Sequence, residues 1–258
     1  MISYIDSHAH ITAASLEGEE EAILLRAKER GIKGILNICT DRKSLERGLQ
    51  LSKQFPWLYH AGATTPHDVE KTGEKDFSFF QEAAKNKRIV AIGETGLDYH
   101  YLHSPKDIQQ KHLIQYLTLA TKFNLPIIFH CRDAFSDLFS ICDTHYRGKA
   151  VLHCFTGTVK EAEEVLTRGW YLSLSGIVTF KKCGELKEVA KKVPLHQLLV
   201  ETDTPYLAPG KYRGKINEPA FLPLIVEVIA EIKGIDVSEV AFVTSKNVKD
   251  LVKMDFSL

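Results

Sequence analysis

The sequence predicts an α/β fold, a single-domain TIM-type (β/α)8 barrel with an extra C-terminal helix. Short apolar segments alternate with amphipathic, helix-like segments, the pattern of a parallel sheet with helical connections. Several apolar segments are nearly continuous in Ile, Val and Leu, as expected for strands covered on both faces. A length of 258 residues, 44% of them hydrophobic, suits one barrel domain. An open doubly wound sheet is the competing architecture, because alternation alone does not show closure.

Each predicted strand is a short apolar segment, and an amphipathic segment follows each of the first seven. The predicted strands are Ser3–His8, Lys33–Ile38, Trp57–Ala61, Arg88–Gly93, Pro126–His130, Lys149–His153, Trp170–Leu174 and Gln197–Glu201. The helices between them are Leu16–Arg30, Lys43–Gln54, Asp76–Asn86, Pro105–Phe123, Phe135–His145, Val159–Arg168 and Glu185–Lys192. Two further helices close the chain, Pro219–Lys233 and Ser238–Met254.

Local boundary signals support several of these helices. Ser104 offers an N-cap immediately before Pro105, a residue favoured at the first helical position. Gly31 stands where a left-handed residue ends the first helix. Asp236 and Glu239 have the spacing of a capping box for the last helix.

The composition excludes some classes of protein and limits others. Lys plus Arg and Asp plus Glu number 33 each, so a nucleic-acid partner would need a local basic patch. Five cysteines, without a C-x-x-C pair, favour reduced thiols and a cytoplasmic location. Residues 1–6 lack the pattern of a signal peptide, and Glu227 and Glu231 interrupt the most apolar late segment, so no membrane span is expected. Without linkers or repeats, residues 1–258 are predicted to form one domain.

Residues that can bind metal ions gather at the ends of five predicted strands. Because the C-terminal ends of barrel strands meet at one mouth, these side chains would lie together. Taken singly, a strand-end histidine is more often a hydrogen-bonded polar residue, Asp203 could cap a turn and Glu94 could begin a loop. Their joint placement at one edge, with no such set at the other, favours a metal site. The candidate ligands are His8, His10, Glu94, His130, His153 and Asp203.

Strand alternation adds detail to this site. Residues two apart point to the same side of a strand, so Asp6, His8 and His10 should share one face. Cys131 and Cys154 directly follow ligand histidines and should point away from the mouth.

The chemistry of the ligand set points to a hydrolase. Imidazoles and carboxylates without thiolates suit Zn, Mn, Co or Fe, and also Mg if waters complete the coordination. Six ligands exceed the need of one catalytic ion, so a pair of divalent ions bridged by one carboxylate is the natural arrangement. Such a pair can activate a water and stabilise both the attacking and the leaving oxygen.

Six segments make the sequence resemble the TatD family of metal-dependent deoxyribonucleases, within the amidohydrolase-type barrels. They run in the family's order across nearly the whole chain. These segments are DSHAH at 6–10, GETGLDY at 93–99, HCRDA at 130–134, HCFTG at 153–157, ETDTPYLAP at 201–209 and RGKINEP at 213–219.

The resemblance implies a role for each candidate ligand. His8, His10 and Asp203 would hold one ion together with Glu94, while His130 and His153 would hold a second ion that Glu94 bridges. Glu94 and Asp203 would be the catalytic carboxylates, and Asp203 would accept the proton of the attacking water. The implied reaction is 3′-5′ exonuclease cleavage of DNA, acting on single-stranded ends. Mg or Mn would be the working metal, with Zn, Co or Ni as alternatives.

Two positions depart from the family's pattern. The family usually has Gly-x-His-Pro after the third strand, but this chain has Thr65 in place of the histidine. Because that histidine often lies near the substrate, the departure bears on the expected substrate preference or rate and leaves the candidate metal ligands unchanged. After His10, the frequent Leu-Asp is replaced by Ile11 and Thr12, which removes a carboxylate near the mouth.

Contacts with the substrate are predicted from charge and aromaticity near the strand ends. Arg132 could bind a phosphate with two hydrogen bonds, or pair with Asp98 or Asp133. Basic residues crowd the loop after the eighth strand, where barrels often bind phosphate, although such clusters are commonly only solvated surface. The predicted substrate residues are Arg132, Arg213, Lys215 and Tyr206, with Lys181, Lys182 and Lys211 as further charges and Tyr99 and Phe155 as further rings.

Two other functions compete with DNA hydrolysis. The same ions could hydrolyse an amide or ester, such as the aminoacyl ester of a D-aminoacyl-tRNA. A barrel that binds nucleic acid or protein without catalysis is less favoured, because the ligand set is complete. DNA is therefore the expected partner, and no obligate protein partner is expected.

Overall fold

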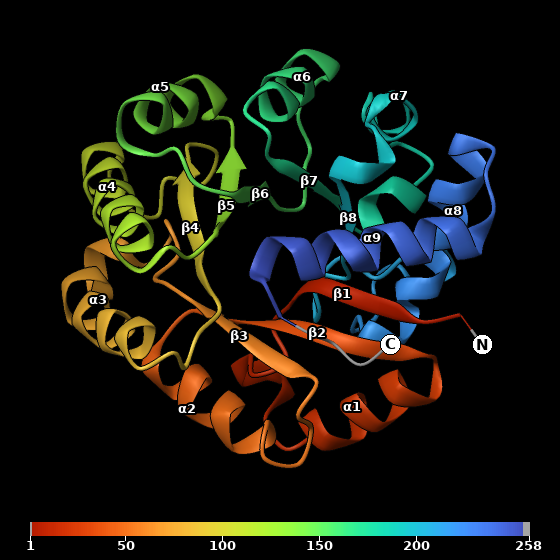
Figure 1. Ribbon diagram of the computed structural model, residues 1–258, viewed down its shortest axis with the longest axis horizontal. Helices are drawn as coiled ribbons and strands as arrows, with labels where there is room; N and C mark the ends of the chain where they lie inside the picture. Colours follow the sequence, from red (N-terminus) through yellow and green to blue (C-terminus); the bar gives the residue numbers. More distant parts are fainter. Residues whose placement is uncertain (1, 255–258) are drawn as a thin grey trace.

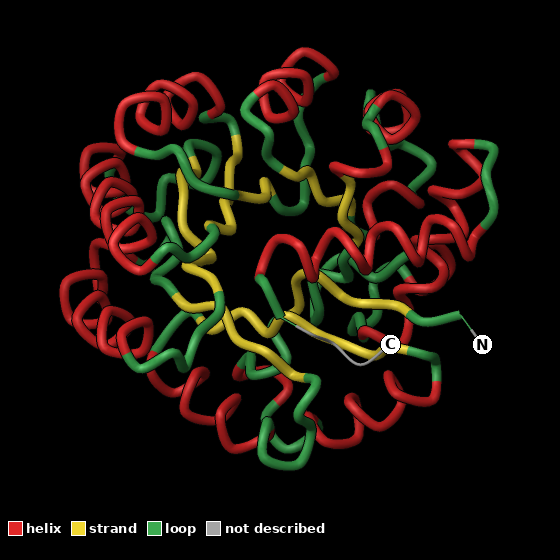
Figure 2. The backbone as a smooth tube through the Cα atoms, viewed as in Figure 1, coloured by secondary structure: helices red, strands yellow, loops and turns green. Residues whose placement is uncertain are grey.

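Eight parallel strands form the centre of the molecule. The computed structural model describes residues 2–254, and within them the strands are paired in sequence order from β1 to β8. Figures 1 and 2 show these strands enclosed by a ring of helices. The strands are β1 (Tyr4–Ala9), β2 (Ile32–Cys39), β3 (Leu58–Gly62), β4 (Ala91–Asp98), β5 (Ile127–Arg132), β6 (Ala150–Leu152), β7 (Tyr171–Leu174) and β8 (Leu198–Val200).

The sheet curls into a nearly closed barrel. Each strand pairs in parallel with the next one, and an isolated parallel bridge joins Ala9 to Thr204, just past β8. Two backbone hydrogen bonds support this bridge, from His10 N–H to Thr204 O at 2.7 Å and from Asp203 N–H to His8 O at 2.9 Å. The predicted barrel is therefore confirmed, and the open doubly wound sheet is excluded. The prediction of one domain over residues 1–258 stays a prediction, since residues 1 and 255–258 lie outside the described part.

Helices pack around the outside of the barrel because each presents an apolar face to the strands. The larger buried cluster lies between strands and helices and includes Ile35, Phe80, Tyr116 and Phe129. None of the helices within residues 2–254 is long and apolar enough to cross a membrane. The helices are α1 (Glu20–Glu29), α2 (Arg42–Leu51), α3 (Val69–Lys85), α4 (Lys106–Phe123), α5 (Phe135–His145), α6 (Val159–Thr167), α7 (Leu186–Lys192), α8 (Leu222–Lys233) and α9 (Val237–Val252).

The extra helix α9 closes the N-terminal end of the barrel (Figure 1). Its apolar residues join a second buried cluster with side chains from the barrel strands, among them Ile5 and Ile128. The Asn247 amide donates hydrogen bonds of 2.8 Å to the carbonyls of Leu195 and Leu198, which ties α9 to β8. With this end filled, a reacting molecule has access only to the opposite end, where the C-terminal ends of the strands lie.

Some boundary signals act differently from the prediction. Gly31 has φ 84°, as expected after a helix, but α4 begins at Lys106 and Ser104 is not its N-cap. Instead, Ser104 Oγ accepts a hydrogen bond of 3.2 Å from Glu70 N–H in the first turn of α3. Asp236 does cap α9, but it accepts its hydrogen bond from Ser238 N–H, so the predicted capping box with Glu239 is wrong. Helix α3 also begins earlier than predicted, at Val69 instead of Asp76.

Strands β4 and β5 extend further toward the mouth than predicted. Their pairing continues from Thr95 opposite Phe129 to Asp98 opposite Arg132. Gly96 permits this close approach, because a Cβ at that position would collide with the backbone oxygen of His130. Glu94 therefore lies within β4 rather than after it, and its backbone is fixed by the barrel itself.

Candidate metal centre

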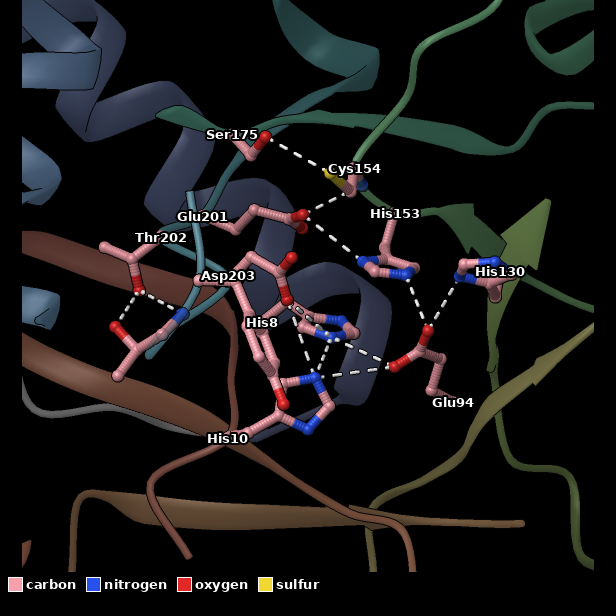
Figure 3. A network of polar contacts seen from close by, with 12 residues as sticks. His8, His10, Glu94, His130, His153, Cys154, Ser175, Glu201, Thr202 and Asp203 are labelled. Atoms are coloured by element: carbon pink, nitrogen blue, oxygen red, sulfur yellow. Dashed lines mark hydrogen bonds and ion pairs between the residues drawn. The ribbon is translucent and has the colours of Figure 1, made fainter. Parts of the chain in front are cut away.

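The six predicted ligands come together at the C-terminal end of the barrel. His8 lies in β1 and His10 just after it, Glu94 in β4 and His130 in β5; His153 follows β6 and Asp203 follows β8. Their side chains are buried or nearly so, and Figure 3 shows them pointing toward one another around the Glu94 carboxylate.

One oxygen of Glu94 faces a first set of donor atoms. Glu94 Oε2 lies 3.6 Å from His8 Nε2 and 3.5 Å from His10 Nε2. Asp203 Oδ1 lies at the same two distances, 3.6 Å from His8 Nε2 and 3.5 Å from His10 Nε2. The two imidazole nitrogens are themselves 3.2 Å apart.

The other oxygen of Glu94 faces a second set. Glu94 Oε1 lies 2.8 Å from His130 Nδ1 and 3.0 Å from His153 Nε2. The carboxylate therefore stands between two histidine pairs and turns one oxygen toward each (Figure 3). The His8 and His153 rings are stacked with centroids 3.8 Å apart, which brings the two sets into direct contact.

These spacings fit the coordination of a cation. Ligand atoms bound tetrahedrally at about 2.1 Å from one metal ion are about 3.4 Å apart. The first set has donor spacings of 3.2 to 3.6 Å. His8, His10 and Glu94 form one group that could hold an ion, and Glu94, His130 and His153 form another.

The electrostatics of the centre also favour positive charge. Burial opposes charge on His153, but Glu94 and Glu201 raise its pKa well above the usual range. Burial would raise the pKa of Glu94, but the neighbouring His153 and the hydrogen bonds from His130 and His153 hold it well below its usual value. Burial lowers the pKa of His8 to about 3, which leaves its imidazole neutral, as a metal ligand must be. The carboxylates thus favour a cation in their midst.

Two acidic residues outside the predicted set contact candidate ligand histidines. Asp98 Oδ2 lies 2.9 Å from His130 Nε2, on the side of the ring opposite Glu94. Glu201 Oε1 lies 3.3 Å from His153 Nδ1, and its other oxygen accepts a hydrogen bond of 2.6 Å from Ser173. A carboxylate on the far nitrogen of an imidazole fixes the tautomer and orientation of a ligand histidine.

The loop that carries Asp203 is fixed by buried polar contacts. Asp6 accepts hydrogen bonds from the backbone and the hydroxyl of Thr202, at 3.0 and 2.6 Å. The Asn217 amide donates to the carbonyls of Thr202 and Tyr206, at 2.7 and 2.6 Å. Asp6 therefore supports the neighbouring loop through Thr202, and β1 is irregular in its pairing with β2.

The two cysteines beside ligand histidines behave differently. Cys131 is buried in the cluster outside the barrel, as alternation predicts. Cys154 is half-buried with φ 42°, and its Sγ lies 3.2 Å from Ser175 Oγ. Burial, followed by the charge of Asp203, raises the pKa of its thiol well above the usual range. The thiol of Cys154 is directed toward Ser175, on the side away from the Glu94 carboxylate (Figure 3).

Thr65 and Thr12, which stand where the family usually has a histidine and an aspartate, make other contacts in this structure. Thr65 donates a hydrogen bond of 3.2 Å to Asp68 beside the start of α3. A different histidine from the same loop reaches the site, since His67 Nε2 lies 3.6 Å from Asp98 Oδ2 and its ring centroid 5.4 Å from that of His130. Thr12 accepts a hydrogen bond of 3.1 Å from buried Asn37.

Of the predicted substrate residues, two flank the ligands. The exposed Tyr206 ring has its centroid 5.9 Å from that of His10. Arg132 contacts Tyr101. Within residues 2–254, the ion pairs of Asp98 and Asp133 are with histidines. The alternative prediction, an ion pair of Arg132 with Asp98 or Asp133, is therefore wrong.

The basic residues after β8 contact aromatic rings along the rim. The Arg213 guanidinium lies 4.5 Å from the centroid of Phe180, and Lys215 Nζ lies 5.8 Å from that of Tyr212. The exposed positions of Arg213 and Lys215 leave their charges available to a polyanion.

Comparison with known proteins adds a family to this geometry. The model of a family described as TatD related DNase matches residues 5–253. An uncharacterized metal-dependent hydrolase of Bacillus subtilis, YabD, is 37% identical over 252 residues, which are 97% of this chain and 99% of that protein. The 3'-5' ssDNA/RNA exonuclease TatD of Escherichia fergusonii is 32% identical over 258 residues, 97% of this chain and 99% of that protein.

Solved structures agree with the barrel. The structure of YJJV, a TatD homologue from Escherichia coli K12, has a TM-score of 0.91 and 29% sequence identity, and the match covers 98% of both chains. A TatD-family hydrolase from Entamoeba histolytica has a TM-score of 0.86 and 25% identity, covering 97% of this chain and 98% of that chain.

Proposed function

The chain belongs to the family of TatD-related DNases, metal-dependent hydrolases, and we propose that it hydrolyses phosphodiester bonds of single-stranded DNA from the 3′ end. The observation that carries this proposal is the Glu94 carboxylate, which turns its two oxygens toward two histidine pairs. A relative that is 32% identical bears the name of a 3'-5' ssDNA/RNA exonuclease, which supports the substrate class.

We assign two divalent ions, Mg or Mn by preference, to this centre. His8, His10, Asp203 and Glu94 Oε2 would hold one of them, and His130, His153 and Glu94 Oε1 the other. When bound, such ions polarise a phosphodiester and lower the pKa of a coordinated water. Asp98 and Glu201 keep the His130 and His153 rings in the orientation that binding requires.

Asp203 is the residue suited to move the proton of the attacking water. Its carboxylate is at the mouth, next to His8 and His10, and the preceding residue, Thr202, is held in place by buried hydrogen bonds to Asp6. A carboxylate positioned within hydrogen-bonding reach of a water can accept its proton as a general base. Tyr206 and Arg132 flank the ligands where they can contact the nucleotide, while Arg213 and Lys215 hold more distant phosphates of the strand.

The decisive experiment is a nuclease assay on protein stripped of metal and then resupplied with Mg or Mn. A single-stranded oligonucleotide labelled at its 5′ end should shorten stepwise, with release of mononucleotides from the 3′ end. Parallel reactions with duplex DNA, D-aminoacyl-tRNA and simple esters test other substrates of the same centre. Turnover of an ester or aminoacyl ester without cleavage of DNA would replace this proposal.

The role of the rim in phosphate binding can be tested with Arg213→Ala. This variant should raise the KM for single-stranded DNA more at low salt than at high salt, because ions screen contacts with phosphates. The plot of log affinity against log salt concentration should become shallower, with the magnitude of its negative slope reduced by about 0.7, the value for one phosphate contact on a single strand. A loss of affinity that is independent of salt would instead assign Arg213 a structural role.

A further inference from the structure

The loop between β4 and α4 exposes aromatic rings beside the metal centre. Tyr101 is 53% exposed, and Leu102 next to it is 48% exposed. The rings of Tyr101 and His103 are stacked, with centroids 5.4 Å apart and an interplanar angle of 26°. Rings grouped on the surface in this way contribute little to the core and are available to a ligand.

A guanidinium lies against this ring pair. The Arg132 guanidinium carbon is 4.8 Å from the centroid of the Tyr101 ring, and Nη1 donates a hydrogen bond of 3.2 Å to the Tyr101 hydroxyl. Arg132 ends β5, two residues after the ligand His130. Aromatic rings next to a cationic side chain are the combination that binds the bases and phosphates of single strands.

One carboxylate fixes these rings relative to the ligands. Asp98 Oδ1 accepts hydrogen bonds from the backbone N–H groups of His100 and Tyr101, at 3.0 and 2.8 Å. Its other oxygen lies 2.9 Å from His130 Nε2. The His67 ring fills the space between, with its centroid 5.8 Å from that of Tyr101 and 5.4 Å from that of His130. Tyr101 is thus two ring contacts away from a metal-ligand candidate.

We propose that Tyr101 and His103 form a stacking platform for one base of single-stranded DNA, with Arg132 on the adjacent phosphate. This inference rests on the proposed function and adds the subsite that positions a nucleotide next to the bond to be cleaved. Every base has a π-face, so the platform should bind any base with little preference.

The charge of the neighbouring surface supports this side of the mouth. A hollow of about 870 Å³ is lined by residues of the loops and helices that follow β4, β5, β6 and β7, and its lining carries more acidic than basic side chains. Acidic groups repel the phosphates of a nucleic acid, so this hollow is the less favourable path for a strand, and Arg132 supplies the positive charge next to the rings. The charged residues of the lining are Asp133, Asp137, Glu161, Glu185, Lys106 and Lys182.

The test compares Tyr101→Ala with the control Tyr101→Phe, which keeps the ring and loses only the hydroxyl. Binding of a fluorescent single-stranded oligonucleotide and its cleavage with Mn are both measured. Tyr101→Ala should raise Kd and KM about tenfold, the effect of losing one stacked base. Tyr101→Phe keeps the ring but loses the hydroxyl that accepts the hydrogen bond from Arg132, so it should lose clearly less affinity than Tyr101→Ala. His103→Ala should also show a smaller loss than Tyr101→Ala. Because both rings are exposed, the melting temperature and its shift on metal addition should not change.

A set of oligonucleotides with one abasic nucleotide at successive positions locates the stacked base. Wild type should bind the abasic oligonucleotide more weakly than the intact one mainly when the abasic nucleotide is at one position. Tyr101→Ala should bind the abasic and the intact oligonucleotide equally at that position. The proposed platform would be overturned if Tyr101→Ala left Kd and KM unchanged. It would also be overturned if the variant weakened binding of abasic DNA as much as binding of intact DNA. Binding that depends on Tyr101 without cleavage would support the platform and overturn the proposed reaction. Neither binding nor cleavage by wild type would overturn both.

Discussion

Glu94→Gln is expected to lower kcat/KM for single-stranded DNA by about a thousandfold or more. Metal ions contribute several kcal/mol of charge stabilisation in a hydrolytic transition state, and each 1.36 kcal/mol corresponds to a factor of ten in rate. Glu94 is the residue whose two oxygens face both donor sets. The amide has nearly the same shape, but it carries no charge and offers only one acceptor oxygen.

Metal binding by this variant can be measured without any substrate. An ion at about one hundred times its Kd stabilises a protein by about 2.7 kcal/mol. For a protein of this size, that energy raises the melting temperature by about 5–10 °C. Wild type should show this shift with Mn, and Glu94→Gln should lose most of it. The variant should still fold, because both apolar clusters lie away from the Glu94 carboxylate.

Glu201→Gln provides the matched control for Glu94→Gln. Both carboxylates are buried and both contact His153, but Glu201 lies on the far nitrogen of that ring. Loss of such an orienting partner costs about 10–100-fold in metal affinity or activity. The two variants should therefore differ clearly in activity. An equal loss in both, or full activity of Glu94→Gln, would contradict a bridging role for Glu94.

The meeting of the candidate ligands at one mouth was predictable because they occupy equivalent places in a repeated element. His130 and His153 each lie at or beside the end of a barrel strand, and parallel strands bring such positions to one mouth. The closure of the barrel was harder to predict. It depends on a bridge between Ala9 and Thr204, and the pattern of apolar segments contains no signal for that contact.

The residues that orient the ligands were missed, although a signal for one of them exists. Asp98 lies four residues after Glu94 in the same strand, so alternation places both side chains on one face. The predicted end of this strand at Gly93 concealed that relation. Glu201 directly follows β8, at the same end of the barrel as the candidate ligands, which is the signal that could have found it. His67 could not have been found, because it reaches Asp98 from a loop whose path depends on tertiary contacts.

Asp203→Asn is expected to lower kcat by about 10²–10⁴-fold with little change in KM, the effect of removing a general base. The asparagine oxygen can still face His8 and His10, and the donor set of His130, His153 and Glu94 is untouched. The variant should therefore retain at least one ion by mass spectrometry and most of the metal-induced rise in melting temperature. The exposed Asp250→Asn serves as a control for the loss of one carboxylate.

Titration with metal separates the two roles of Asp203. If Asp203 served only as a ligand, excess Mn would fill the weakened site and restore kcat, because affinity would be the sole defect. If it accepts the proton of the attacking water, saturation with Mn leaves kcat low, since the amide is not basic. We expect the second result. Asp203 stands at the mouth of the centre with its side chain 12% exposed, where a water can reach it, whereas the His8 side chain is completely buried.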